Sequence, residues 1–159
     1  MSRPPRVRGF RYKGAHRYFL TFCTFNRAPL FVSTTTVSAT LAQFRKTSRE
    51  EAFEILAYCF MPDHAHLLVE GLEERSDLQR FSKLAKQRSG GIHARLTGKR
   101  LWQEGYYDRV LREGDDILTL TRYVLNNPIR AGLVANAKDY PHIGSDRWSL
   151  TELIGAYET

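Results

Sequence analysis

The stretch FEILAYCFMPDHAHLLVE (Phe53–Glu70) predicts a β-hairpin at the centre of the fold. Apolar residues dominate on both sides of the turn signal Pro62-Asp63, as expected of two buried strands joined by a tight turn. Side chains alternate between the two faces of a strand, so His64 and His66 share one face. A hydrophobic strand gains nothing from imidazole groups, and this pair of histidines therefore points to a function.

The pattern on either side of the hairpin predicts an α+β domain. The expected elements are, in order, a strand at 17–25, a helix at 35–50, the hairpin, a helix at 77–97, an extended segment or strand pair at 101–112, and a helix at 115–127. This order is typical of a ferredoxin-like antiparallel sheet with a helix added at the C-terminal end. We expect helices on one face of the sheet and a free second face that holds the site.

Glycine and proline residues refine these elements. The pair Gly90-Gly91 weakens or breaks the second helix, and Gly105 bends the extended segment. Pro128 ends or kinks the last helix and suits the start of a further short helical turn. The domain organisation that we expect is a basic N-terminal arm at 1–14, a single domain at 15–150 and a C-terminal tail at 151–159.

Length and composition limit the class of protein. With 159 residues, 42% of them hydrophobic, the chain is expected to fold as one domain with its own core. No apolar run approaches the ~20 residues of a membrane span, and no apolar region of a secretory signal follows the basic N-terminus. Cys23 and Cys59 lack metal-site spacing, so we expect two reduced core thiols in a cytoplasmic protein.

Basic residues gather in two blocks of the sequence. The formal net charge is +7, and residues 1–17 contain no acidic residue, while residues 75–100 contain only Asp77. Such blocks favour a polyanionic partner, above all nucleic acid, although a solvated surface with a disordered tail gives the same pattern. The residues that we expect to contact DNA are Arg3, Arg6, Arg8, Arg11, Lys13, Arg80, Lys83 and Lys86.

Two imidazoles at i and i+2 on one strand are able to converge on a divalent cation. A third ligand must then come from another element, and a merely hydrogen-bonded or exposed histidine pair is the alternative. In the last predicted helix, Tyr123 and Asn127 are one turn apart. Asn127 offers a carbonyl oxygen for a hard cation, and Tyr123 offers a phenol, which is a nucleophile once deprotonated. A core-edge tyrosine and a helix-end asparagine are the alternatives, and the spacing alone does not bring this helix to the histidines.

Three ordered blocks, MPDHAHLLVE, LWQEGYYDRVLR and YVLNNPIRAGLV, resemble the single-tyrosine HUH transposases, in particular the REP-associated tyrosine transposases of bacteria. The resemblance extends from about residue 17 to residue 148. It implies a ferredoxin-like fold, Mg²⁺ or Mn²⁺ bound by His64, His66 and Asn127, and Tyr123 as the nucleophile. The small Ala65 stands where much of the wider superfamily has a bulky apolar residue, which puts little in doubt.

The resemblance also implies the partner and the reaction. The partner is a palindromic DNA hairpin with a flanking single strand, bound by a monomer in the bacterial cytoplasm at the nucleoid, while a dimer that exchanges the last helix stays open. The reaction is metal-dependent transesterification on single-stranded DNA through a 5′-phosphotyrosine intermediate. A replication-initiator or relaxase-type nickase, a non-catalytic nucleic-acid-binding module and a phosphodiesterase that uses water are the alternatives.

Three other tyrosines compete with Tyr123 for the role of nucleophile. Tyr106 and Tyr107 are adjacent in the extended segment, and Tyr140 lies in the C-terminal part of the chain. Neighbouring residues of an extended segment face opposite ways, so at most one of Tyr106 and Tyr107 is expected to approach the metal.

Overall fold

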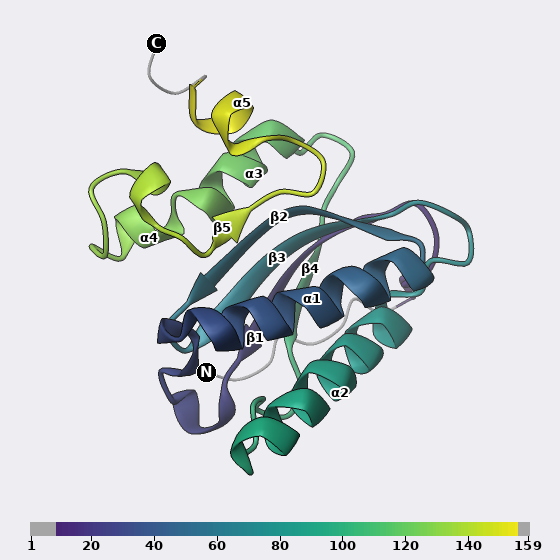
Figure 1. The fold of residues 1–159 in the computed structure, drawn as a ribbon. Helices are drawn as coiled ribbons and strands as arrows, with labels where there is room; N and C mark the ends of the chain where they lie inside the picture. Colours follow the sequence, from purple (N-terminus) through teal and green to yellow (C-terminus); the bar gives the residue numbers. More distant parts are fainter. Residues whose placement is uncertain (1–8, 156–159) are drawn as a thin grey trace.

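Five antiparallel strands form one sheet in the order β4-β1-β3-β2-β5 in the computed structural model, which describes residues 9–155 (Figure 1). The strands are β1 (Arg17–Cys23), β2 (Phe53–Met61), β3 (His64–Gly71), β4 (Tyr107–Val110) and β5 (Ile143–Gly144). The helices are α1 (Thr34–Glu50), α2 (Leu78–Thr97), α3 (Ile117–Leu125), α4 (Asn127–Arg130) and α5 (Leu150–Gly155).

The topology confirms the ferredoxin-like fold. Strands β1 and β2 both pair with β3, and α1 connects them; strands β3 and β4 both pair with β1, and α2 connects them. These two interleaved βαβ units place β1 and β3 in the middle of the sheet. The predicted hairpin of β2 and β3 turns at Pro62-Asp63, directly before His64.

Helices α1 and α2 cover one face of the sheet (Figure 1). Aromatic rings fill the core beneath them, with ring centroids of Trp102 and Phe44 6.0 Å apart and those of Trp102 and Phe22 5.8 Å apart. The Trp102 indole N–H donates to the Ser89 hydroxyl at 2.9 Å, which satisfies the buried polar atoms of both. This packing outweighs low helix propensity, because α2 continues unbroken through Gly90-Gly91.

Helices α3, α4 and α5 lie on the opposite face (Figure 1). Val124 and Leu125 of α3 pack with Leu68 and Cys59 of the central strands, and Leu153 of α5 belongs to the same buried cluster. The sequence pattern predicted that this face would stay free. Instead, helices cover it over β2 and β3. These helices leave an opening between β1 and β3, which is lined by His64 and His66 of β3.

Several element boundaries differ from the prediction. Strand β1 ends at Cys23, since the chain turns into the 3-10 helix η1 (Phe25–Arg27). Of the segment 101–112 only β4 is a strand, while Trp102 forms an isolated bridge with Thr24 and places its side chain in the core. The last predicted helix, α3, ends at Leu125 instead of residue 127, and the further short helical turn expected at Pro128 is α4, which begins at Asn127.

The two ends of the described chain contact the domain. Tyr12 is buried in the main core and Lys13 forms an isolated bridge with Asp77, so part of the expected arm packs against the sheet. The expected tail at 151–159 begins inside α5, whose Leu153 is 3% exposed. Within residues 9–155, no helix has the length and hydrophobicity needed to span a bilayer.

Candidate active site

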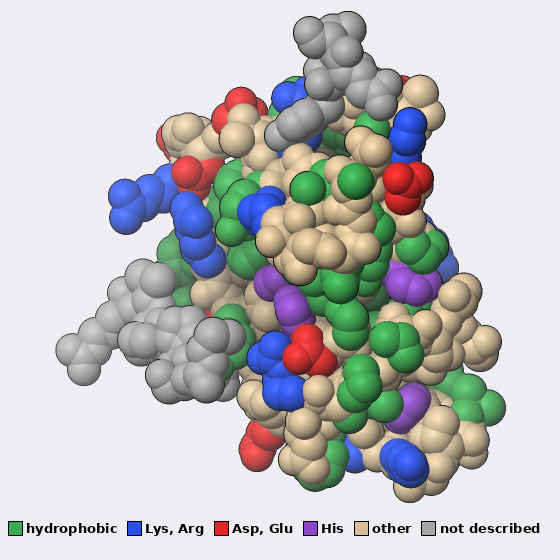
Figure 2. Space-filling model, turned by 90° about the vertical axis from the view of Figure 1, so that its left-hand side faces the viewer, with side chains coloured by type: hydrophobic (Ala, Val, Ile, Leu, Met, Phe, Trp, Pro, Cys, Tyr) green, Lys and Arg blue, Asp and Glu red, His purple; other side chains and the backbone are tan. Residues whose placement is uncertain are grey.

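His64 and His66 lie side by side on the face of the sheet that carries α3. Their ring centroids are 4.7 Å apart, with the rings edge to face. On β1, Cys23 is the register partner of His64 and Thr21 is that of His66. Together with Arg27 and Tyr107, these side chains line a hollow of about 310 Å³. Figure 2 shows histidine side chains at the surface beside basic and acidic ones.

Both imidazoles are oriented by a neighbour at Nδ1. The Asp63 carboxylate lies 2.7 Å from Nδ1 of His64, and the Thr21 hydroxyl lies 2.9 Å from Nδ1 of His66. A carboxylate only accepts hydrogen bonds, so Nδ1 of His64 carries a proton, and Nε2 is the atom that has a free lone pair in the neutral form of the ring. Burial, together with the charges of His64 and Arg130, lowers the pKa of His66 to about 3, which keeps this ring neutral near pH 7.

Asp63 is a functional candidate that the sequence identified only as a turn residue. Its carboxylate binds His64 through Oδ1 and Arg27 Nε through Oδ2, the latter at 3.0 Å. Burial by itself would raise the pKa of Asp63, but the hydrogen bonds from His64 and Arg27 outweigh it and lower the pKa below its usual value. Metal-binding histidines commonly have such a carboxylate partner.

The donor set fits a hard divalent cation only if a ligand other than His, Cys, Asp or Glu completes it. In the described residues no group of three or more of these four residue types is placed to hold a metal. His64 and His66 offer two oriented imidazoles, and a further ligand has to come from a residue such as Asn127. Whether these residues bind a metal together stays a prediction.

Tyr123 and Asn127 lie on either side of a break in the helical backbone, not on one continuous helix as the spacing suggested. Tyr123 belongs to α3 and is 55% exposed, and Asn127 is the first residue of α4. Neither lines the hollow of the histidines. Both contact Arg130: the guanidinium carbon lies 3.7 Å from the centroid of the Tyr123 ring, and Nη2 donates to Asn127 Oδ1 at 3.4 Å.

Arg130 is a second functional candidate that the sequence did not identify. Its positive charge contributes to the lowered pKa of His66. It also acts on Cys59, the register partner of His66 on β2. Arg130 therefore connects the Tyr123–Asn127 pair with the β2 side of the histidine pair.

The competing tyrosines occupy different places. Tyr107 lines the histidine hollow, and Tyr106 packs on the other face with its ring 5.4 Å from that of Phe22. This confirms that at most one of the two approaches the histidines. The Tyr140 hydroxyl donates to the Phe60 carbonyl at 2.5 Å, and burial raises its pKa to about 12.

Those predicted DNA-binding residues that the structure describes do not line the hollow of the histidines. Arg80 pairs with Glu51 at 3.0 Å, and Lys86 donates to the carbonyls of Gln103 and Gly105. Arg80, Lys83 and Lys86 belong to α2, on the opposite face of the sheet. Arg11 and Lys13 are exposed near the start of α2, whereas Arg3, Arg6 and Arg8 lie outside the described residues.

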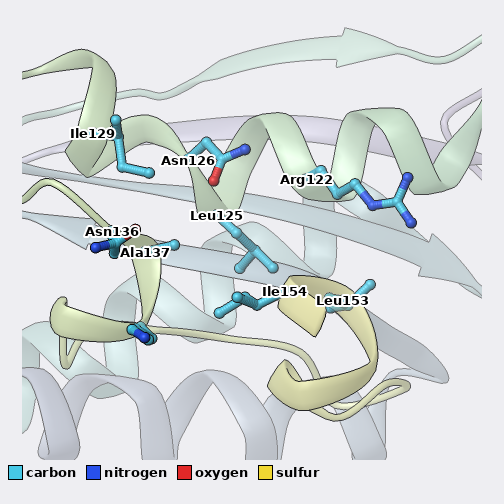
Figure 3. Close-up of a pocket in the computed structure, with 9 residues that line it drawn as sticks. Arg122, Leu125, Asn126, Ile129, Asn136, Ala137, Leu153 and Ile154 are labelled. Carbon is cyan, nitrogen blue, oxygen red and sulfur yellow. The ribbon is translucent and has the colours of Figure 1, made fainter. Parts of the chain in front are cut away.

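A second, smaller cavity of about 140 Å³ lies between α3, α4 and α5 (Figure 3). Its lining is mostly apolar, with Leu125, Ile129 and Leu153 among the residues that face it. None of its described lining residues is His, Cys, Asp or Glu. The histidine hollow is therefore the better candidate for an active site.

Comparisons with known proteins identify a family and several relatives of the chain. The model of the family "Transposase IS200 like" matches residues 13–127. The chain is 25% identical over 146 residues to the "Putative REP-associated tyrosine transposase" of Haemophilus influenzae, covering 79% of this chain and 77% of the relative. It is 28% identical over 99 residues to the REP-associated tyrosine transposase of Escherichia coli, covering 60% and 56%. Its fold resembles a REP-associated tyrosine transposase bound to a REP hairpin, with a TM-score of 0.71, 23% identity, and 88% and 82% of the chains covered.

Proposed function

The chain belongs to the IS200-like transposase family, and from this premise we propose that it cleaves and rejoins single-stranded DNA through Tyr123. One observation carries the proposal. Two imidazoles, each held by a neighbour at Nδ1, lie on the face of the sheet that also carries Tyr123, Asn127 and the Arg130 that contacts both.

His64, His66 and Asn127 are the residues that would hold Mg²⁺ or Mn²⁺. Asn127 supplies the oxygen donor that hard cations prefer, and the two imidazoles supply nitrogen donors. When bound, the ion would polarise the scissile phosphate and stabilise negative charge on the leaving oxygen. Asp63 and Thr21 keep the imidazoles in position, so these two ligands need little reorganisation on binding.

The reaction forms one bond and breaks one. The Tyr123 hydroxyl gives up its proton to solvent as its oxygen attacks the phosphorus, the bond from phosphorus to the 3′ oxygen breaks, and that oxygen takes up a proton from solvent to become a free 3′-OH. The 5′ end stays attached as a phosphotyrosine, and a different 3′-OH reverses the step and joins new ends. The Arg130 guanidinium stacks on the phenol ring, which limits the orientations available to this otherwise exposed side chain.

The DNA partner follows from the relatives. Both relatives are named for an association with REP elements, and the solved structure of similar fold holds a REP hairpin. We propose that this chain likewise binds a palindromic hairpin and cleaves the single strand beside it, as a monomer acting on chromosomal DNA in the cytoplasm. The net charge of +7 favours such a partner.

A covalent adduct tests this function. The protein is incubated with Mg²⁺ and a labelled single-stranded oligonucleotide that contains a REP-type hairpin and both flanks, and the products are separated on a denaturing gel. We expect a band of protein bound to DNA with the wild type, and none with His64→Ala or His66→Ala. His16→Ala, a histidine outside the hollow, is the matched control. An adduct of normal yield from both site variants would contradict the role of the histidines.

A further inference from the structure

Arg27 lines the histidine hollow, although the reaction described above gives it no role. Its guanidinium donates from Nε to Asp63 Oδ2 at 3.0 Å and from Nη1 to Cys23 Sγ at 3.3 Å. In the described part of the chain these bonds use two of its five N–H groups, and the side chain is 45% exposed. Donors of the guanidinium therefore remain available to a ligand in the hollow.

The backbone around Arg27 is held in an unusual conformation. Asn26 and Arg27 have φ angles of 54° and 53°, in the left-handed region that residues with a β-carbon rarely adopt. Thr24 anchors this loop, because its backbone N–H and its hydroxyl each donate to the Asp63 carbonyl at 3.0 Å. Unfavourable backbone conformations of this kind gather at functional sites. The loop holds Arg27 against the turn that precedes His64.

The geometry of the Arg27 guanidinium favours an anionic ligand in the hollow. Asp63 is negative and neutralises one positive charge, but its two oxygens already face His64 and Arg27. A guanidinium presents its N–H groups in a planar fork, which suits two oxygens of one phosphate. A phosphodiester at the histidine pair would bring such oxygens to the exposed part of Arg27.

We propose that Arg27 binds a non-bridging oxygen of the scissile phosphate, from the β1 side of the histidine pair. This assignment rests on the proposed function, since it needs a phosphodiester in the hollow. The Asp63 carboxylate positions the guanidinium, and the anchored loop keeps it there before DNA arrives. Arg27 thus orients the phosphate, while Arg130 lies on the β2 side and orients Tyr123.

Binding to DNA with one neutral linkage tests the role of Arg27. The position of cleavage is first mapped with wild-type protein. Affinities are then measured in EDTA for two hairpin oligonucleotides, one unmodified and one with a methylphosphonate at the scissile position. Tyr123→Phe serves as the parent protein because it leaves the DNA intact. Arg27→Gln, Arg27→Lys and Asp63→Asn are added to it one at a time, and thermal unfolding verifies that each variant is folded.

We expect the parent to bind the methylphosphonate about tenfold more weakly than the phosphodiester, the size of one charge-assisted hydrogen bond. Arg27→Gln should bind both oligonucleotides alike, and Arg27→Lys should keep part of the difference. Asp63→Asn should keep most of it, because the guanidinium is still present. A methylphosphonate one linkage away should weaken the parent and Arg27→Gln equally.

Three results would overturn the assignment. The first is equal affinity of the parent protein for the phosphodiester and the methylphosphonate, and the second is folded Arg27→Gln that keeps the full difference between the two affinities. The third result is a loss of this difference in Asp63→Asn that is as complete as in Arg27→Gln, which would mean that Arg27 acts only through Asp63. If the wild type does not cleave DNA at all, the proposed function is wrong and the assignment falls with it. If cleavage occurs and one of the three results is found, the assignment of Arg27 alone fails.

Discussion

Replacement of Asp63 by asparagine tests how the histidine pair is prepared for a metal. The substitution keeps the shape of the side chain and removes its negative charge, 2.7 Å from Nδ1 of His64 and 3.0 Å from Nε of Arg27. An amide has only one oxygen. If that oxygen faces His64, the NH₂ group faces the Arg27 guanidinium, so one of the two hydrogen bonds is lost.

The size of the effect follows from these contacts. Loss of such an outer partner of a metal ligand typically lowers metal affinity 10- to 100-fold, or about 1.4–2.8 kcal/mol. Fold stability should change less, because the Arg27–Asp63 ion pair is partly exposed, with side chains 45% and 31% exposed, and such pairs contribute at most about 1 kcal/mol. The loss in metal affinity should therefore exceed the loss in stability.

Titration calorimetry with Mn²⁺ measures this affinity without DNA. We expect weaker binding in Asp63→Asn and a smaller loss in Thr21→Val, which removes a neutral hydroxyl from Nδ1 of His66. Asp139→Asn, an exposed aspartate outside the hollow, controls for the lost charge. Mn²⁺ affinity that is unchanged in both Asp63→Asn and Thr21→Val would refute the idea that these neighbours prepare the imidazoles.

Three further predictions follow from the same geometry. Arg130→Ala should slow adduct formation about tenfold without changing hairpin affinity, and Arg130→Lys should retain part of the rate; an unchanged rate in Arg130→Ala would show that stacking on Tyr123 is unimportant. The pKa of His66 is lowered to about 3 in the folded protein, so between pH 6.5 and 3 this imidazole binds a proton in the unfolded chain but not in the folded one. Falling pH therefore favours the unfolded chain, and the metal-free protein should lose stability over this range. In urea unfolding, the free energy of unfolding should fall by up to about 1.4 kcal/mol per pH unit because of His66, and this contribution should be absent from His66→Asn. Equal dependence of the free energy of unfolding on pH in the two proteins would contradict it. Hairpin affinity should fall with salt at a log–log slope of about −0.7 per phosphate contacted. Deletion of residues 1–8, which spares the buried Tyr12, should reduce both the affinity and this slope. Affinity that changes with neither salt nor the deletion would contradict a role of the N-terminal arm in DNA binding.

Much of the fold was predictable because its signals are local. Strand alternation and the Pro62-Asp63 turn specify the hairpin, and helical spacing specifies α1 and α2. Pro128 indicated that the last helix would end or kink, but the sequence did not locate the break at Asn126 or the two-residue strand β5, because both depend on how α3, α4 and the C-terminal segment pack on the sheet. The same packing explains why the second face is covered.

The site was predictable only in part. The common face of His64 and His66 follows from strand alternation, whereas the role of Tyr123 came from resemblance and is untested by the structure. The contacts of Asp63, Arg27 and Arg130 had no usable signal. Arg27 reaches the hollow through a left-handed backbone that its sequence does not demand, and Arg130 reaches Tyr123 across the break between α3 and α4.

The identity of the tyrosine bound to DNA is the most direct test of the account. Tyr107 makes the test demanding, because its side chain lines the histidine hollow while that of Tyr123 does not. The adduct formed with a hairpin oligonucleotide is trapped, digested with protease and nuclease, and the modified peptide is sequenced by mass spectrometry. We predict a nucleotide on Tyr123, an adduct of normal yield from Tyr107→Phe, and none from Tyr123→Phe. A nucleotide on Tyr107, or an adduct that persists in Tyr123→Phe, would contradict the proposal that Tyr123 is the nucleophile.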